Sequence, residues 1–272
     1  MSYSKLTLIK EDMTEDMSFD EYNARQLYEI SPERNHDRAF RTKAAGKFFY
    51  SDGVWTPGEY EGFAVVSMLN ENPGNEPLAA RLVEVQKELQ YHLLPRYAFY
   101  YLPSESFHQT IANTLSDDRF KKHILEQGIE GKYPLMVADA FRKIPLPLED
   151  EPIRMKMAGL SIFGTAIGIL GTIENESDYS RITDFRNAFY ANKALAKLDV
   201  RMTRPFIGHI TLAYIEHSPN KNQKEYLSVV ISEINEALEK EENYFYISQT
   251  GLRRYHHLAE FIMKDNYPTH LI

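Results

Sequence analysis

Histidine and threonine occur two residues apart at two places in the sequence, as His108/Thr110 and His209/Thr211. Both pairs lie in short apolar segments, SFHQTIANTL and PFIGHITLAYI, whose composition favours β-strands. Because residues i and i+2 of a strand project from the same face, each motif places an imidazole beside a hydroxyl group. The apolar neighbours would point to the opposite face and hold each strand against the core.

Two imidazoles and two hydroxyl groups around one space would suit the cleavage of a phosphoester. A neutral histidine can take a proton from water or from a ribose hydroxyl, and a protonated one can give a proton to the departing oxygen. Histidine suits both roles because its unperturbed pKa is ~6.5. The threonines would donate hydrogen bonds to the non-bridging oxygens. The sequence alone leaves open which histidine is the base and which is the acid.

The positions of the two motifs in the sequence support a functional role more strongly than the motifs themselves do. The chain has nine histidines, and a single strand histidine is more often structural. Here, however, each motif ends a repeated order of apolar strand, amphipathic helix and motif strand. The two helices are expected at about 78–93 and 178–198, so each motif histidine follows its helix start by about 30 residues. This repeat predicts two strand–helix–strand units that bring the motifs together in one cleft.

The remaining chain supplies the elements around these units. Residues 1–45 are polar, with short helices and loops expected, and GKFFYSDGVWTPG predicts a hairpin that turns at Ser51-Asp52-Gly53. A third helix is expected at about 221–240, and YFYISQTGL and RRYHHLAEFIM are expected to form a final hairpin. We therefore expect an N-terminal extension, 1–60, packed on a catalytic domain, 61–272. Its lobes would cover approximately 61–150 and 151–272, and strands could be exchanged between them.

Four further residues are candidates for binding a substrate. Arg204 and Arg254 could pair with a phosphate, Asn113 could orient the substrate, and Tyr101 could stack on a base, as could Tyr100 or Tyr214. Each has a simpler alternative. The arginines could form surface salt bridges, and with 18 tyrosines in the chain each is more commonly a core or rim residue.

We expect no metal and no other cofactor. His256, His257 and Glu260 could suggest a metal site, but adjacent residues of a strand point to opposite faces. The chain has no cysteine, which excludes disulfides and thiolate ligands. It contains no P-loop, G-x-S-x-G or G-x-G-x-x-G pattern.

Charge and hydropathy limit the partners. The net charge of −8 makes duplex DNA a poor ligand, although a local positive pocket could still hold a small anion. No apolar run approaches the ~18 residues of a membrane helix, and the N-terminus lacks the apolar core of a signal peptide. We therefore expect a cytoplasmic monomer that acts on a small nucleotide or an RNA terminus, without a membrane partner.

SFHQTIANTL and PFIGHITLAYI resemble the two signature strands of the two-histidine (2H) phosphoesterase superfamily, which includes RNA-ligase-like proteins and cyclic phosphodiesterases. The resemblance covers about residues 60–265 and is greatest to an uncharacterised bacterial branch in which a hairpin and a strand also precede the first motif. It implies a bilobal α+β fold with antiparallel sheets beside a cleft. It also implies metal-free hydrolysis of a cyclic or 2′,5′ phosphodiester by His108, Thr110, His209 and Thr211.

Two alternatives remain open at this stage. The chain could be a catalytically idle module that binds a nucleotide or RNA in the same cleft. It could also be an RNA-end ligase that runs related chemistry in reverse.

Overall fold

The computed structural model describes residues 15–148 and 150–272 and has an α+β fold, which confirms the predicted class. Every strand pairing in this part of the chain is antiparallel. The strands are β1 (Phe48–Ser51), β2 (Val54–Pro57), β3 (Gly62–Met68), β4 (Phe99–Tyr101), β5 (His108–Ser116), β6 (Ile153–Ile162), β7 (Ala166–Ile173), β8 (His209–Ile215), β9 (Tyr244–Ile247), β10 (Gln249–Tyr255) and β11 (Thr269–Leu271).

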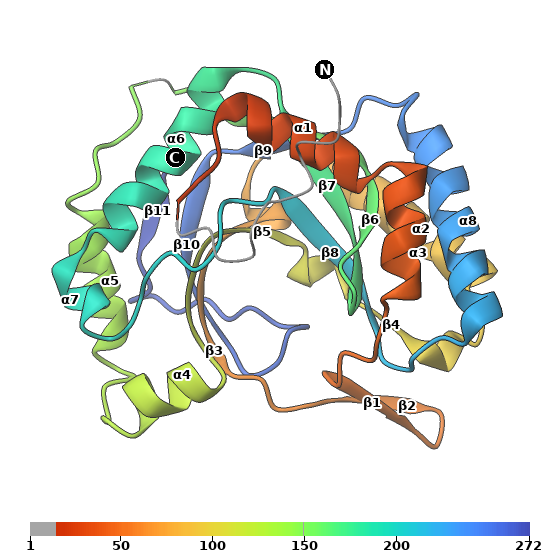
Figure 1. Cartoon of the computed structure of the whole chain (residues 1–272). Coiled ribbons are helices and arrows are strands. Elements are labelled where there is room, and N and C mark those ends of the chain that lie inside the picture. The colour runs from red at the N-terminus through yellow and green to blue at the C-terminus, as the bar shows by residue number, and fades with distance from the viewer. Residues whose placement is uncertain (1–14, 149) are drawn as a thin grey trace.

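Helices cover the outer faces of the sheets (Figure 1). One group packs on β6 and β7, and another lies beside β5 and β11. The helices are α1 (Phe19–Glu29), α2 (Pro32–Phe40), α3 (Glu76–His92), α4 (Asp118–Phe120), α5 (Tyr133–Phe141), α6 (Glu176–Tyr190), α7 (Lys193–Ala196) and α8 (Lys221–Leu238). No helix of the described part of the chain is long and apolar enough to cross a membrane.

Two larger sheets each carry one of the motifs. The first has the strand order β11-β10-β3-β5 and ends in the first motif strand, and the second has the order β4-β8-β7-β6-β9. The halves of the chain exchange strands: β4, from the first half, pairs with β8, and β10, from the second half, pairs with β3. The third sheet is the predicted hairpin β1–β2, whose turn residues Asp52 and Gly53 have positive φ as a type I′ turn requires.

The prediction that YFYISQTGL and RRYHHLAEFIM form a final hairpin is wrong. β9 and β10 follow one another with Ser248 between them, but β9 pairs with β6 and β10 pairs with β3. At this crossing the side chain of Asn72 accepts hydrogen bonds from the backbone of Ser248 and of Gln249. The chain therefore passes from one sheet to the other, and the segment after Tyr255 forms irregular structure before β11.

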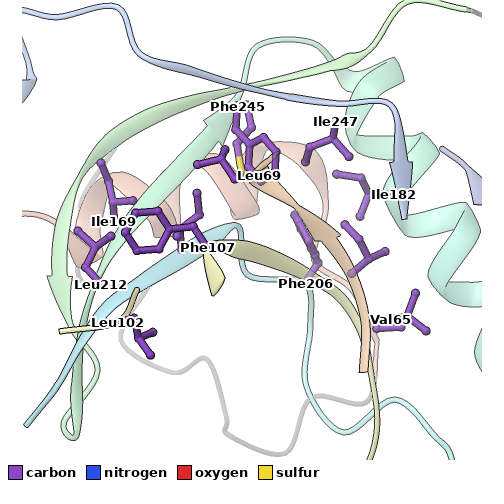
Figure 2. Close-up of a cluster of buried hydrophobic side chains, with 14 of the residues drawn as sticks. Val65, Leu69, Leu102, Phe107, Ile169, Ile182, Phe206, Leu212, Phe245 and Ile247 are labelled. Carbon is purple, nitrogen blue, oxygen red and sulfur yellow. The ribbon is translucent and has the colours of Figure 1, made fainter. Parts of the chain in front are cut away.

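One continuous apolar core lies between the two large sheets and their helices. Figure 2 shows buried side chains on strands of both sheets, with Val65 of β3 on one side and Ile169 of β7 and Leu212 of β8 on the other. Phe107 and Phe206, which precede the two motifs, lie in the same cluster. Each buried side chain of this size contributes about 1.5–3 kcal/mol, so both motif strands are held firmly where they begin.

The N-terminal extension is attached to the second motif strand. α1 lies beside β7, and its Gln26 amide donates to the carbonyls of Gly171 (2.8 Å) and Gly208 (2.7 Å) (Figure 1). Glycine is required at position 208, since a Cβ there would lie 2.2 Å from the hydroxyl of Tyr22.

A buried ion pair connects the segment just before α1 with both motif strands. Asp16 and Arg186 of α6 meet at 2.8 Å, with side chains 5% and 2% exposed. The backbone N–H of Phe206 donates to Asp16 (2.5 Å). The Arg186 guanidinium donates to the carbonyls of Ile111, in β5, and Arg204 (2.9 Å). One salt bridge thus connects residue 16, β5 and the segment that leads into β8.

We expect Asp16→Asn to lower the free energy of unfolding by about 3–5 kcal/mol, because it leaves the Arg186 charge buried without a counter-charge. Urea unfolding measures this change. Asp37→Asn is the control: Asp37 is 39% exposed and pairs with Arg34 and with the more exposed Arg41, and we expect a loss of at most about 1 kcal/mol. Equal losses in the two variants would show that the Asp16–Arg186 pair contributes no more than a surface pair.

Candidate active site

The two motifs lie in one pocket. A cavity of about 350 Å³ is lined by His108, Thr110, His209 and Thr211 together. The two histidines are close enough that a charge on His108 lowers the pKa of His209. The structure thus brings the four residues together as the sequence repeat predicted.

Matching β-bulges shape this wall of the pocket. The pairing of β5 with β3 shifts register after Thr110, and the pairing of β8 with β7 shifts after Thr211. Each bulge changes the side-chain alternation, so the third residue after each threonine faces the pocket again. These residues are Asn113 and Tyr214.

Each imidazole forms the same kind of hydrogen bond, to the backbone carbonyl two residues earlier. The Nδ1 atom of His108 lies 2.7 Å from the carbonyl oxygen of Ser106, and Nδ1 of His209 lies 2.9 Å from that of Ile207. A carbonyl oxygen only accepts, so Nδ1 carries the proton in each ring. In the neutral imidazole Nε2 then keeps its lone pair, the arrangement that a general base needs.

Burial keeps both imidazoles neutral near pH 7. It lowers the pKa of His108 to about 4, against the opposing effect of the Ser106 carbonyl. It lowers the pKa of His209 to about 3, with a further contribution from the positive charge of Arg204. Near pH 7 a nearby anion would favour a positive charge on either imidazole.

Each imidazole also contacts a phenylalanine. The ring of Phe261 lies 4.1 Å from that of His108, and the ring of Phe163 lies 5.1 Å from that of His209, measured between centroids. Both phenylalanines line the cavity, as do Tyr60 and Tyr255, whose rings stack at 6.2 Å. The pocket thus combines two imidazoles and two hydroxyl groups with several aromatic faces.

Two of the four candidate substrate-binding residues lie in the pocket. Arg204 and Asn113 both line the cavity, and the Arg204 guanidinium donates to the amide oxygen of Asn113 (3.4 Å). An amide is neutral, so this contact leaves the positive charge of Arg204 uncompensated. Arg204 can attract an anion to the side of the pocket that holds His209.

Arg254 and Tyr101 do not line this cavity. Arg254 is 2% exposed, and its guanidinium forms ion pairs with Glu61 (2.6 Å) and Glu130 (2.8 Å). It balances two carboxylates, so its charge is not available to a substrate. Tyr101 pairs with Ala213 in the sheet, and its hydroxyl group is buried.

Of the aromatic residues in the pocket, the sequence analysis named Tyr214 and missed the others. Phe163, Tyr60, Tyr255 and Phe261 come from separate segments, and no spacing connects them with the motifs. Ser116 also lines the pocket, and it follows a second register shift in the pairing of β5 with β3. Asn113 and Tyr214, which the sequence analysis named as candidates, both line the pocket three residues after a motif threonine. The adjacent His256 and His257, which the sequence analysis argued cannot face one ion, contact different residues: His256 contacts Glu61 (2.7 Å), whereas His257 faces Glu260 (3.8 Å).

Comparisons with known proteins identify a shared fold. No family model matches the sequence, and no curated protein matches it. The fold is similar to that of the conserved protein of unknown function ATU0111 from Agrobacterium tumefaciens, with a TM-score of 0.54 and 17% identity over 82% of this chain and 89% of that one. TT0787 of Thermus thermophilus matches with a TM-score of 0.45 and 15% identity, covering 77% of this chain and 94% of that one.

The lowered histidine pKa values predict a pH dependence of stability. Between pH 6.5 and about 4 the unfolded chain takes up protons that the folded His108 and His209 refuse, so the free energy of unfolding falls as the pH falls. The loss is at most about 1.4 kcal/mol per pH unit for each histidine. Urea unfolding at pH 7 and pH 5 measures it.

The control for this measurement is the double variant His108→Gln/His209→Gln. It removes both titrating groups, and we expect it to lose less stability than the wild type between pH 7 and pH 5. The same loss in both proteins would contradict the neutral, buried state of the imidazoles.

Proposed function

We propose that this chain is a 2H-type phosphodiesterase that hydrolyses a cyclic or 2′,5′ phosphodiester of a nucleotide or an RNA end. The observation that supports this most is the convergence of His108/Thr110 and His209/Thr211 on one cavity, each with its Nδ1 held by a backbone carbonyl. Two imidazoles with free Nε2 atoms are sufficient for acid–base catalysis without a metal.

In the proposed mechanism His209 is the base and His108 the acid. Arg204 disfavours a positive charge on His209, whereas no cation contributes to the pKa of His108. The phosphodiester anion enters beside Arg204, and its charge favours protonation of His108. Nε2 of His209 takes a proton from water as that oxygen attacks phosphorus. His108 gives its proton to the departing oxygen, and the bond from that oxygen to phosphorus breaks.

The threonines and the aromatic rings complete this proposal. The hydroxyl groups of Thr110 and Thr211 donate to the non-bridging oxygens, which hold the negative charge during the transfer. Tyr60, Tyr255 and Phe261 offer ring faces on which a base can stack.

A binding module without turnover is the second candidate. The observation that favours it is the neutral state of both imidazoles near pH 7, since neither ring then carries a proton on Nε2 that it could give to a departing oxygen. In that case the pocket would bind a nucleotide and release it unchanged.

Turnover of 2′,3′-cyclic nucleotides and of short 2′,5′-linked oligonucleotides separates the two candidates. We expect hydrolysis to proceed in the presence of EDTA, because the histidines supply both proton transfers. Binding without hydrolysis would support the module. Activity that EDTA removes and a divalent ion restores would contradict the metal-free mechanism.

We expect His108→Ala and His209→Ala each to abolish hydrolysis. Thr110→Ala and Thr211→Ala should each lower kcat by about 10²–10³-fold, the cost of one hydrogen-bond donor to the transition state. Steady-state kinetics measure these effects, with His256→Ala as the control, because His256 is an exposed histidine outside the cavity. Near-normal turnover in either motif histidine variant would rule out the assignment.

A further inference from the structure

The middle residue of the first motif reaches the second motif. Gln109 is fully buried, and its amide oxygen accepts from the backbone N–H of His209 (2.5 Å). Its amide nitrogen donates to the carbonyl of Ile207 (3.1 Å) and to that of Thr110 (2.8 Å). The side chain thus connects β5, at the edge of one sheet, with the start of β8 in the other.

Gln109 takes the place of a neighbouring strand. β4 pairs with β8 from Ala213 to Ile215, so the start of β8 extends beyond it. The N–H of residue 209 and the C=O of residue 207 project to the same side of the chain, where a neighbouring strand would bond them. A primary amide has one acceptor and one donor side, and it satisfies both groups.

The carbonyl of Ile207 also orients the imidazole of His209. Ile207 O accepts from Gln109 and also from Nδ1 of His209 (2.9 Å). Gln109 therefore fixes the backbone of His209 on one side and the acceptor of its imidazole on the other. His108 and Thr110, the neighbours of Gln109 in β5, are on the opposite face and line the cavity.

The equivalent residue of the second motif does nothing comparable. Ile210 is apolar and fully buried in the core cluster. The connection between the motifs therefore runs in one direction, from the first His-x-Thr to the second.

We infer that Gln109 is a positioning residue that sets the distance and orientation of His209 relative to His108 and Thr110. This role rests on the proposed function for its effect on turnover, whereas its effect on the His209 ring does not. Its loss should leave both sheets folded and allow the two histidines to drift apart. A displacement of about 1 Å between reacting groups can cost about 10²-fold in rate.

The test compares Gln109→Met with Gln86→Met. Methionine keeps the length of the side chain and removes its hydrogen bonds, three at Gln109 and two at Gln86. Gln86 is a matched control, since its buried amide also serves the edge of β8 by donating to Leu102 O and Leu212 O, both at 2.8 Å. Both variants lose a buried amide that satisfies backbone groups, so we expect similar falls in Tm.

Turnover should separate the two variants. We expect Gln109→Met to lower kcat by about 10²-fold with a smaller change in KM, and Gln86→Met to keep kcat within a few-fold of the wild type. Equal losses of kcat in both variants, or a normal kcat in Gln109→Met, would overturn the positioning role.

A spectroscopic measurement keeps the inference testable if the wild type shows no turnover, which would count against the proposed function alone. Two-dimensional ¹H–¹⁵N spectra of the imidazoles report the tautomer and pKa of each histidine. We expect Gln109→Met to change the tautomer equilibrium and the pKa of His209 and to leave those of His108 close to the wild type. Unchanged His209 signals in Gln109→Met would overturn the inference.

Discussion

The start of β8 must satisfy its backbone hydrogen bonds where it extends beyond β4. Buried N–H and C=O groups are almost always paired, because an unpaired one costs as much as a lost hydrogen bond. Here side chains supply the partners: Gln109 bonds the groups of residues 207 and 209, and Gln86 bonds the carbonyl of Leu212. The two sheets can therefore separate at this point, and the space between them becomes the pocket.

The two halves of the pocket have the same local structure but differ in their charges. Both motifs have a bulge after the threonine, a histidine held by the carbonyl two residues earlier, and a phenylalanine against the imidazole. The symmetry ends at Arg204, which lies near His209 and contributes to lowering its pKa. A symmetrical pair of imidazoles would have no preference for the base. Under the proposed mechanism Arg204 would supply that preference, and it would also attract an anion to its side of the pocket.

Local patterns predicted the parts of this structure that depend on local geometry. The period of two in the motif strands placed each histidine beside its threonine, and Asp52-Gly53 fixed the hairpin turn. The expected helix at 178–198 divides into α6 and α7 at Asn192, whose side chain caps α7. Asparagine is a common N-cap, so a break there was accessible to the same reasoning.

Long-range contacts decided the features that the sequence analysis missed. Arg253 and Arg254 look alike in the sequence, and both become buried beside glutamates from distant segments, Glu71 for the first and Glu61 for the second. No periodicity reveals a partner almost 200 residues away. The passage of the chain from one sheet to the other at Ser248 also depends on a distant residue, because the side chain of Asn72, in the other half of the chain, accepts a hydrogen bond from the backbone there.

The low histidine pKa values have a consequence for the proposed function. Near pH 7 both imidazoles are uncharged, so under the proposal one of them becomes an acid only when an anion has raised its pKa. A bound phosphodiester would supply that anion, because its negative charge would stabilise a second proton, on Nε2 of His108. The charge of Arg204 disfavours the corresponding proton on His209. A neutral ligand of the same shape would leave both imidazoles uncharged, with a proton on Nδ1 only. We therefore expect the pocket to discriminate by charge as well as by shape, although the chain as a whole carries a net charge of −8.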